Sequence, residues 1–171
     1  MTFRPEEEFA AYLINRTKNR TSIIPVIEEI LKENLDVQIV AIPRYDEQVK
    51  HLRRYFKDKI LVCRNSIDGP SLLHYTSVFV GGGGTMTSEA ALLGVPTFSC
   101  YPIEPFIILR YLIEKKLVKL ERDPRAMAEK ILSTLDNIEC ERSKQSERAK
   151  RLIRTFEDPI QVIASEIEKT V

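Results

Sequence analysis

The most informative segment of the chain lies between residues 80 and 96 and reads Val80-Gly81-Gly82-Gly83-Gly84-Thr85-Met86-Thr87-Ser88-Glu89-Ala90-Ala91-Leu92-Leu93-Gly94-Val95-Pro96. The apolar run Ser77–Val80 predicts a strand, and Thr87–Leu93 predicts a helix that Gly94 ends with a left-handed C-terminal cap. A glycine loop between a strand and a helix is typical of open α/β folds, whose ligands bind at the carboxyl ends of parallel strands. We therefore expect this segment to organise both the fold and the binding site.

The segments on either side repeat the alternation of strand and helix. Further strands are predicted at residues 37–43, 59–63 and 95–100, more weakly at 117–120, and in Thr2-Phe3-Arg4, which looks like the end of a first strand. Helices are predicted from a cap at Ser22 to Asn34, from a cap at Asp46 to Phe56, over residues 69–75, 105–116, 124–135, 139–156 and 159–169, and from Pro5 onward. This pattern predicts a Rossmann-like three-layer α/β/α sandwich with a mostly parallel sheet of five to six strands.

Composition limits the classes of protein that the chain can belong to. Its 171 residues include 26 Lys+Arg and 25 Asp+Glu, so the formal net charge is +1. That length suits one domain over residues 1–171, and the near-zero charge gives no reason to expect a nucleic-acid partner. No apolar run approaches the roughly 20 residues of a membrane span, and the acidic start is unlike a signal peptide. With three scattered cysteines and no CxxC pair, we expect a reduced cytoplasmic protein without a zinc site.

The glycine loop predicts an anion site. Glycines let the main chain approach a ligand closely, and the free N–H groups that open the next helix attract phosphate. The residues expected to bind phosphate are Gly81, Gly82, Gly83, Gly84, Thr85, Met86 and Thr87. Alternatively, the glycines serve only a tight turn and close packing of helix on sheet. No Gly-Lys-Ser/Thr of a P-loop occurs, and the dinucleotide pattern GxGxxG fits poorly because Met86 occupies the third glycine position.

Three charged residues extend the predicted site toward a nucleotide. Glu89 falls about one turn into the helix, and a carboxylate beside phosphates is favourable when it accepts hydrogen bonds, for which ribose hydroxyls are natural donors. Alternatively, Glu89 is an acid favoured by the helix dipole. Arg4 and Arg44 stand at the expected carboxyl ends of strands, where each could bind phosphate or instead pair with a neighbouring carboxylate.

Neither a catalytic residue nor a metal site is predicted. The sequence contains no Ser-His-Asp or Cys-His order, no close pair of carboxylates and no Asp-x-Asp cluster. Donors at a helix terminus can neutralise a diphosphate by themselves, so we expect no cofactor.

Between Gly82 and Pro96 the sequence resembles, with small offsets, the pattern Gly-Gly-x-x-Thr-x-x-Glu-Ala-x-x-x-Gly-x-Pro of the C-terminal half of two-domain GT-B-fold enzymes. These include a lipid-linked N-acetylglucosaminyltransferase and UDP-N-acetylglucosamine 2-epimerase. Residues 42–48, 68–73 and 82–86 together are also similar to an archaeal family of uncharacterised two-domain proteins. The resemblance implies a nucleotide-sugar ligand such as a UDP-sugar, with Glu89 at the ribose and the loop at the diphosphate.

Two departures from the family pattern change what the resemblance implies. The 2-epimerase has His-Arg-x-x-Asn after its first strand, where this chain has Arg4-Pro5-Glu6-Glu7-Glu8; the histidine is absent, which argues against epimerase chemistry. The resemblance also covers only the second half of such proteins. We therefore expect the chain to bind without turnover unless an N-terminal acceptor domain or a partner chain completes it. The alternatives are a non-catalytic interaction module, with a partner or as a homodimer, and a module for other phosphate ligands.

Overall fold

The computed structural model describes residues 1–7, 22–33 and 36–169 of the chain. Within these residues six strands form one sheet in the order β3-β2-β1-β4-β5-β6, and every neighbouring pair is parallel. The strands are β1 (Thr2–Arg4), β2 (Val40–Ala41), β3 (Leu61–Val62), β4 (Phe79–Gly81), β5 (Thr97–Ser99) and β6 (Val118–Leu120). The predicted sheet of five to six mostly parallel strands is confirmed.

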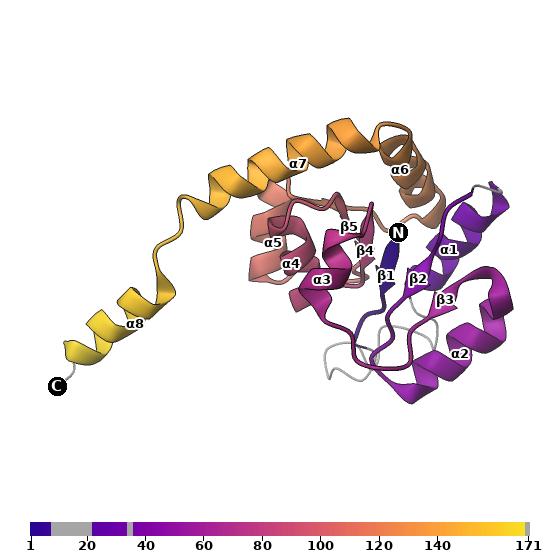
Figure 1. Ribbon diagram of the computed structural model, residues 1–171, viewed down its shortest axis with the longest axis horizontal. Coiled ribbons are helices and arrows are strands. Elements are labelled where there is room, and N and C mark those ends of the chain that lie inside the picture. Colours follow the sequence, from indigo (N-terminus) through magenta and orange to yellow (C-terminus); the bar gives the residue numbers. More distant parts are fainter. Residues whose placement is uncertain (8–21, 34–35, 170–171) are drawn as a thin grey trace.

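Helices cover both faces of this sheet (Figure 1). They are α1 (Ile23–Lys32), α2 (Asp46–Phe56), α3 (Gly69–His74), α4 (Thr85–Leu92), α5 (Ile107–Glu114), α6 (Pro124–Asp136), α7 (Ile138–Ile153) and α8 (Pro159–Glu168), with a short 3₁₀ turn at Lys57–Lys59. One apolar core contains buried side chains of α1, α2 and α6, and a second contains side chains of α4, α5 and α7. Within β4, Val80 belongs to the first core and Phe79 to a third cluster with α3, because neighbouring residues of a strand point to opposite faces.

Three helices begin with the same local signal. Asp68, Asp123 and Asp158 stand at the N-caps of α3, α6 and α8, and each carboxylate accepts a hydrogen bond from a main-chain N–H of the first turn. A proline follows each aspartate within the first two helical positions, where the N–H it lacks is not needed. These starts agree with the prediction from sequence.

Several predicted boundaries are wrong. Helix α4 begins at Thr85 rather than Thr87, and α5 begins at Ile107 rather than Pro105. Asp46 lies inside α2, whose N-cap is Tyr45. Residues 5–7 are not helical, and Glu6 packs against Gly82 of the glycine loop. The rest of the helix expected there lies outside the described residues.

Ser22 is at the N-cap of α1, as predicted, but its side chain does not cap the helix. Instead, Glu6 accepts hydrogen bonds from the main-chain nitrogen of Ser22 at 2.7 Å and from its hydroxyl at 2.8 Å. Glu6 is completely buried. A carboxylate from the end of β1 therefore satisfies the start of α1 and ties the two elements together.

Helix α8 extends away from the sheet beyond the end of α7 (Figure 1). None of its residues is buried, and Ile160, Ile163 and Ile167 are exposed. They are spaced three and four residues apart, so they form one apolar stripe without a partner among the described residues. None of the described helices is both long and apolar enough to cross a membrane.

Candidate functional site

The strand order places a crevice between β1 and β4. The chain runs from β1 outward to β3 on one side and from β4 outward to β6 on the other, so the connections leave these two central strands in opposite directions. Arg4 pairs with Gly81 in the register of the two strands. Ligands of open parallel sheets bind outside the carboxyl ends of the strands at such a switch point, which is where the glycine loop begins.

The four glycines divide into two pairs with different roles. Gly81 is the last residue of β4, and the N–H of Gly82 donates to the carbonyl of Arg4 at 2.9 Å, so this first pair continues the sheet. Gly83 and Gly84 follow with φ of 89° and 94°, a region that side chains rarely adopt. The loop therefore turns away from the sheet at the second pair.

The amides after this turn are open. Within the described residues, the N–H groups of Gly83, Gly84, Thr85 and Met86 donate no hydrogen bond to a protein atom, and the N-cap residue Gly84 has no side chain with which to satisfy them. They belong to the start of α4, whose first-turn N–H groups have no partner within the helix. Unpaired amides and the positive end of the helix dipole together favour an anion at this place.

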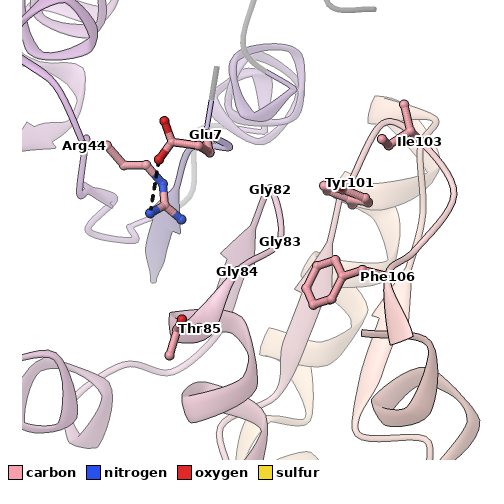
Figure 2. A pocket seen from close by; sticks show the side chains of 9 residues that line it. All are labelled: Glu7, Arg44, Gly82, Gly83, Gly84, Thr85, Tyr101, Ile103 and Phe106. Carbon is pink, nitrogen blue, oxygen red and sulfur yellow. Dashed lines mark ion pairs between the residues drawn. The ribbon is translucent and has the colours of Figure 1, made fainter. Parts of the chain in front are cut away.

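A cavity of about 450 Å³ lies in front of these amides. Its lining residues are Glu7, Arg44, Gly82, Gly83, Gly84, Thr85, Tyr101, Ile103 and Phe106. Figure 2 shows the charged side chains on one side of the glycine loop and the apolar ones on the other. Tyr101 and Phe106 meet edge to face, with ring centroids 5.8 Å apart. The cavity thus joins a wall formed by the glycine loop and Arg44 to an aromatic wall.

Arg44 brings a cation to the loop. A Cβ placed on Gly84 would lie 2.9 Å from its Nη2, so the guanidinium is in direct contact with the loop. Its Nη1 lies 3.9 Å from Oε2 of Glu7, and its Nε donates to the carbonyl of Pro5 at 3.3 Å. The main-chain N–H of Arg44 donates to Gln48 at 2.8 Å, which fixes the start of α2 relative to the site.

Arg4 provides a second cation below the loop. Its Nη1 donates to the carbonyls of Ile42 and Pro43 at 3.1 and 3.2 Å, whereas its buried Nε has no hydrogen-bond partner in the part of the chain that the structure describes. Burial, followed by repulsion from Arg44, lowers the pKa of the Arg4 guanidinium from its ordinary value, and Glu7 opposes this shift. The charged groups around the loop are therefore two guanidinium groups, of Arg4 and Arg44, and two carboxylates, of Glu7 and of the buried Glu6 that packs on Gly82.

A second cavity, of about 500 Å³, adjoins the first and shares Glu7 and Arg44 with it. Arg4 and Met86 line it, together with residues 63–67 after β3 and Gly69 at the start of α3. The two cavities follow the carboxyl edge of the sheet from β3 to β5.

The structure brings together most of the residues predicted from sequence. Gly82, Gly83, Gly84, Thr85 and Arg44 line the first cavity, and Arg4 and Met86 line the second. Their role in binding remains a prediction.

Gly81, Thr87 and Glu89 line neither cavity. Thr87 is buried, and its hydroxyl has no hydrogen-bond partner among the described residues. The carboxylate of Glu89 faces Gly69, where a Cβ would lie 3.8 Å from Oε2. The cavities therefore do not test the ribose contact predicted for Glu89, which stays a prediction.

The prediction from sequence missed Glu7, Tyr101 and Phe106. Glu7 comes three residues after β1, and Tyr101 comes two residues after β5. Both positions follow the carboxyl ends of strands, so the rule that located Arg4 and Arg44 could also have found them. Phe106 is further along the chain, at the N-cap of α5, and its ring packs edge to face on Tyr101 in the wall of the cavity.

Among the described residues, no three His, Cys, Asp or Glu side chains gather in an arrangement that could hold a metal ion. Cys100 lies close beneath the loop, where its thiol is 3.7 Å from the carbonyl of Gly81. Burial raises the pKa of this thiol to about 12, so it stays protonated and unreactive at neutral pH.

The fold and the position of the crevice define the class of the protein: it is a Rossmann-like domain of the kind that forms one half of a GT-B fold. The chain belongs to the family described as "Protein of unknown function (DUF354)", whose family model matches residues 1–171. An uncharacterized protein of the archaeon Methanocaldococcus jannaschii is 44% identical over 93 residues, which are 54% of this chain and 26% of that protein. The predicted relationship to an uncharacterised archaeal family is confirmed.

Two solved structures share the fold. A Listeria monocytogenes protein assigned as a UDP-N-acetylglucosamine 2-epimerase has a TM-score of 0.60 and 16% identity over 89% of this chain and 42% of its own. The glycosyltransferase VinC, solved in complex with DTDP, has a TM-score of 0.57 and 16% identity over 87% of this chain and 37% of its own. The matched part of this chain therefore spans less than half the length of each of these three proteins.

Proposed function

We propose that this chain is the nucleotide-sugar-binding part of a glycosyltransferase-like protein, with a UDP-sugar as its ligand. The observation that supports this most strongly is the set of open amides from Gly83 to Met86, because these residues line the two adjoining cavities that share Arg44. These groups suit a diphosphate because each phosphate can accept several hydrogen bonds from main-chain N–H groups and a guanidinium.

The two cavities suggest how the rest of the ligand is arranged. The diphosphate lies at the loop and Arg44, where the cavities meet. On one side, the exposed ring of Phe106, which packs on the buried Tyr101, offers a surface that suits the apolar face of a sugar. On the other side, the cavity beside Arg4 and residues 63–67 has room for a nucleoside. Glu89, behind Gly69, is the proposed acceptor for the ribose hydroxyls on that side.

Isothermal titration calorimetry with UDP and UDP-N-acetylglucosamine tests this proposal. We expect both to bind, and we expect Arg44→Gln to weaken binding by about tenfold or more, because it removes a hydrogen bond between charged groups. Arg110→Gln is the matched control, since Arg110 pairs with Glu104 outside the cavity. Absence of binding to the wild-type chain would refute the proposal. Unchanged affinity for UDP in Glu89→Ala would remove the ribose role of Glu89 alone.

We further propose that an acceptor domain or a partner chain covers the site. The exposed side chains of Ile107, Ile108 and Tyr111 continue the apolar wall of the cavity along α5. Neither these side chains nor the stripe of α8 has a covering partner among the described residues. The glycosyltransferase activity itself thus depends on an acceptor domain or partner chain.

The same apolar surfaces favour a second candidate function, a non-catalytic interaction module. Size-exclusion chromatography with light scattering distinguishes the two when UDP is added. The interaction module predicts a stable dimer or larger assembly without ligand binding, whereas the nucleotide-sugar proposal requires heat of binding whatever the oligomeric state.

A further inference from the structure

Glu7 lies at the junction of the two cavities. It lines both of them, and among the described residues it is the one carboxylate that lines the cavity containing the glycine loop. In the structure its Oε2 is 3.9 Å from Nη1 of Arg44. The carboxylate therefore occupies part of the space around the cation that a phosphate would approach (Figure 2).

The main chain before Glu7 is held in place from several directions. A Cβ on Gly82 would lie only 2.5 Å from the main-chain nitrogen of Glu6, so the segment is pressed against the loop. Arg44 donates to the carbonyl of Pro5, and Gln48 donates to the carbonyl of Glu6 at 3.2 Å. These contacts hold the main chain up to Glu6, so the side chain of Glu7 begins from a fixed point beside the junction.

We propose that the carboxylate of Glu7 makes the site select its ligand by charge. The site then favours a diphosphate esterified at both ends over one that has a free terminal phosphate. This inference rests on the proposed function, because it places the diphosphate at the loop. The second pKa of a terminal phosphate is about 6, so at pH 7 a nucleoside diphosphate carries nearly one more negative charge than a nucleoside diphosphate sugar. Glu7 repels that additional charge.

The size of the selection follows from distance and solvent exposure. For a phosphate charge about 6 Å from the Glu7 carboxylate, in a site that solvent partly screens, Coulomb's law gives the size of the repulsion. At an effective dielectric constant of about 40 to 80, one additional charge at that distance changes affinity by about threefold to tenfold. Glu7 repels the charges that the two ligands have in common to the same extent in both. The ratio of the two affinities therefore isolates the effect of the additional charge on the free terminal phosphate.

The test is calorimetric titration of UDP and UDP-glucose, without divalent cations and at low salt, into wild type, Glu7→Gln and Glu104→Gln. Glutamine keeps the shape of Glu7 and removes its charge. Glu104→Gln is the matched control, because it removes an exposed carboxylate that pairs with Arg110 outside both cavities. The quantity compared is the dissociation constant of UDP divided by that of UDP-glucose.

We expect this ratio to fall by about threefold or more in Glu7→Gln, to stay unchanged in Glu104→Gln, and to change less at high salt. An unchanged or higher ratio in Glu7→Gln would overturn the role of Glu7 and leave the proposed function intact. If neither nucleotide binds the wild-type chain, the proposed function fails, and this inference fails with it.

Discussion

Gly84→Ala tests the conformation that opens the loop. Gly84 has φ 94° and ψ −179°, a region that is essentially restricted to glycine, and a side chain held there costs about 1–3 kcal/mol. The new methyl group would also lie 2.9 Å from Nη2 of Arg44, but the tip of that flexible side chain can move at little cost. We therefore expect backbone strain, and not the contact with Arg44, to account for most of the destabilisation.

The effect of alanine on the unfolded chain must be separated from this strain. Replacing glycine by alanine also stabilises a protein by about 0.4–1 kcal/mol through the unfolded state. Gly69→Ala is a matched control, because its φ lies outside the strained region and its Cβ would meet its nearest neighbours at 3.8 and 3.9 Å. In urea unfolding followed by circular dichroism, Gly84→Ala should have a free energy of unfolding about 1–3 kcal/mol below that of Gly69→Ala. Equal stability of the two variants would refute the strained conformation.

Three further perturbations have expected outcomes. Glu6→Ala leaves the main-chain nitrogen of Ser22 without its acceptor and should lower the free energy of unfolding by about 1–3 kcal/mol in urea. Asp123→Ala removes the cap of α6 and should lower it by about 1 kcal/mol in the same assay, where no change would contradict the observed cap. The pKa of the Cys100 thiol, raised by burial from 9.0 to about 12, means that the native state keeps a proton that the unfolded state releases. Stability measured by unfolding at several pH values should therefore be fully present below pH 9 and fall by up to about 1.4 kcal/mol per unit toward pH 12, more steeply than in Cys100→Ala; parallel curves would show that the thiol is not buried.

The architecture could be predicted from the sequence because its main signals are local. Asp68, Asp123 and Asp158, each followed by proline, mark the starts of three helices. Apolar runs mark the strands, although β2 and β3 contain only two residues each. The strand prediction was longer at these places because residues that flank a short strand can be just as apolar. Such boundaries depend on pairing between distant segments, which no local pattern shows.

The position of the candidate site could be predicted in part, because its main motif is also local. The glycine loop is one continuous motif, so its position was evident from sequence. The contacts that shape it come from distant segments: Glu6 packs on Gly82, and Arg44 reaches Gly84. That Gly81 and Gly82 continue the sheet while Gly83 and Gly84 open toward the cavity depends on the register between β1 and β4. Four identical residues in a row carry no signal that could distinguish these two pairs.

We propose that the amides of Gly83, Gly84, Thr85 and Met86 bind an anion. The most direct measurement is a ¹H–¹⁵N NMR titration of the wild-type chain with pyrophosphate. We predict that the resonances of these four amides shift together and saturably, while the amide of Gly94, which donates to the carbonyl of Ala91, does not move. Saturable binding that leaves the four loop amides unshifted would contradict the claim, as would an absence of any shift at millimolar pyrophosphate.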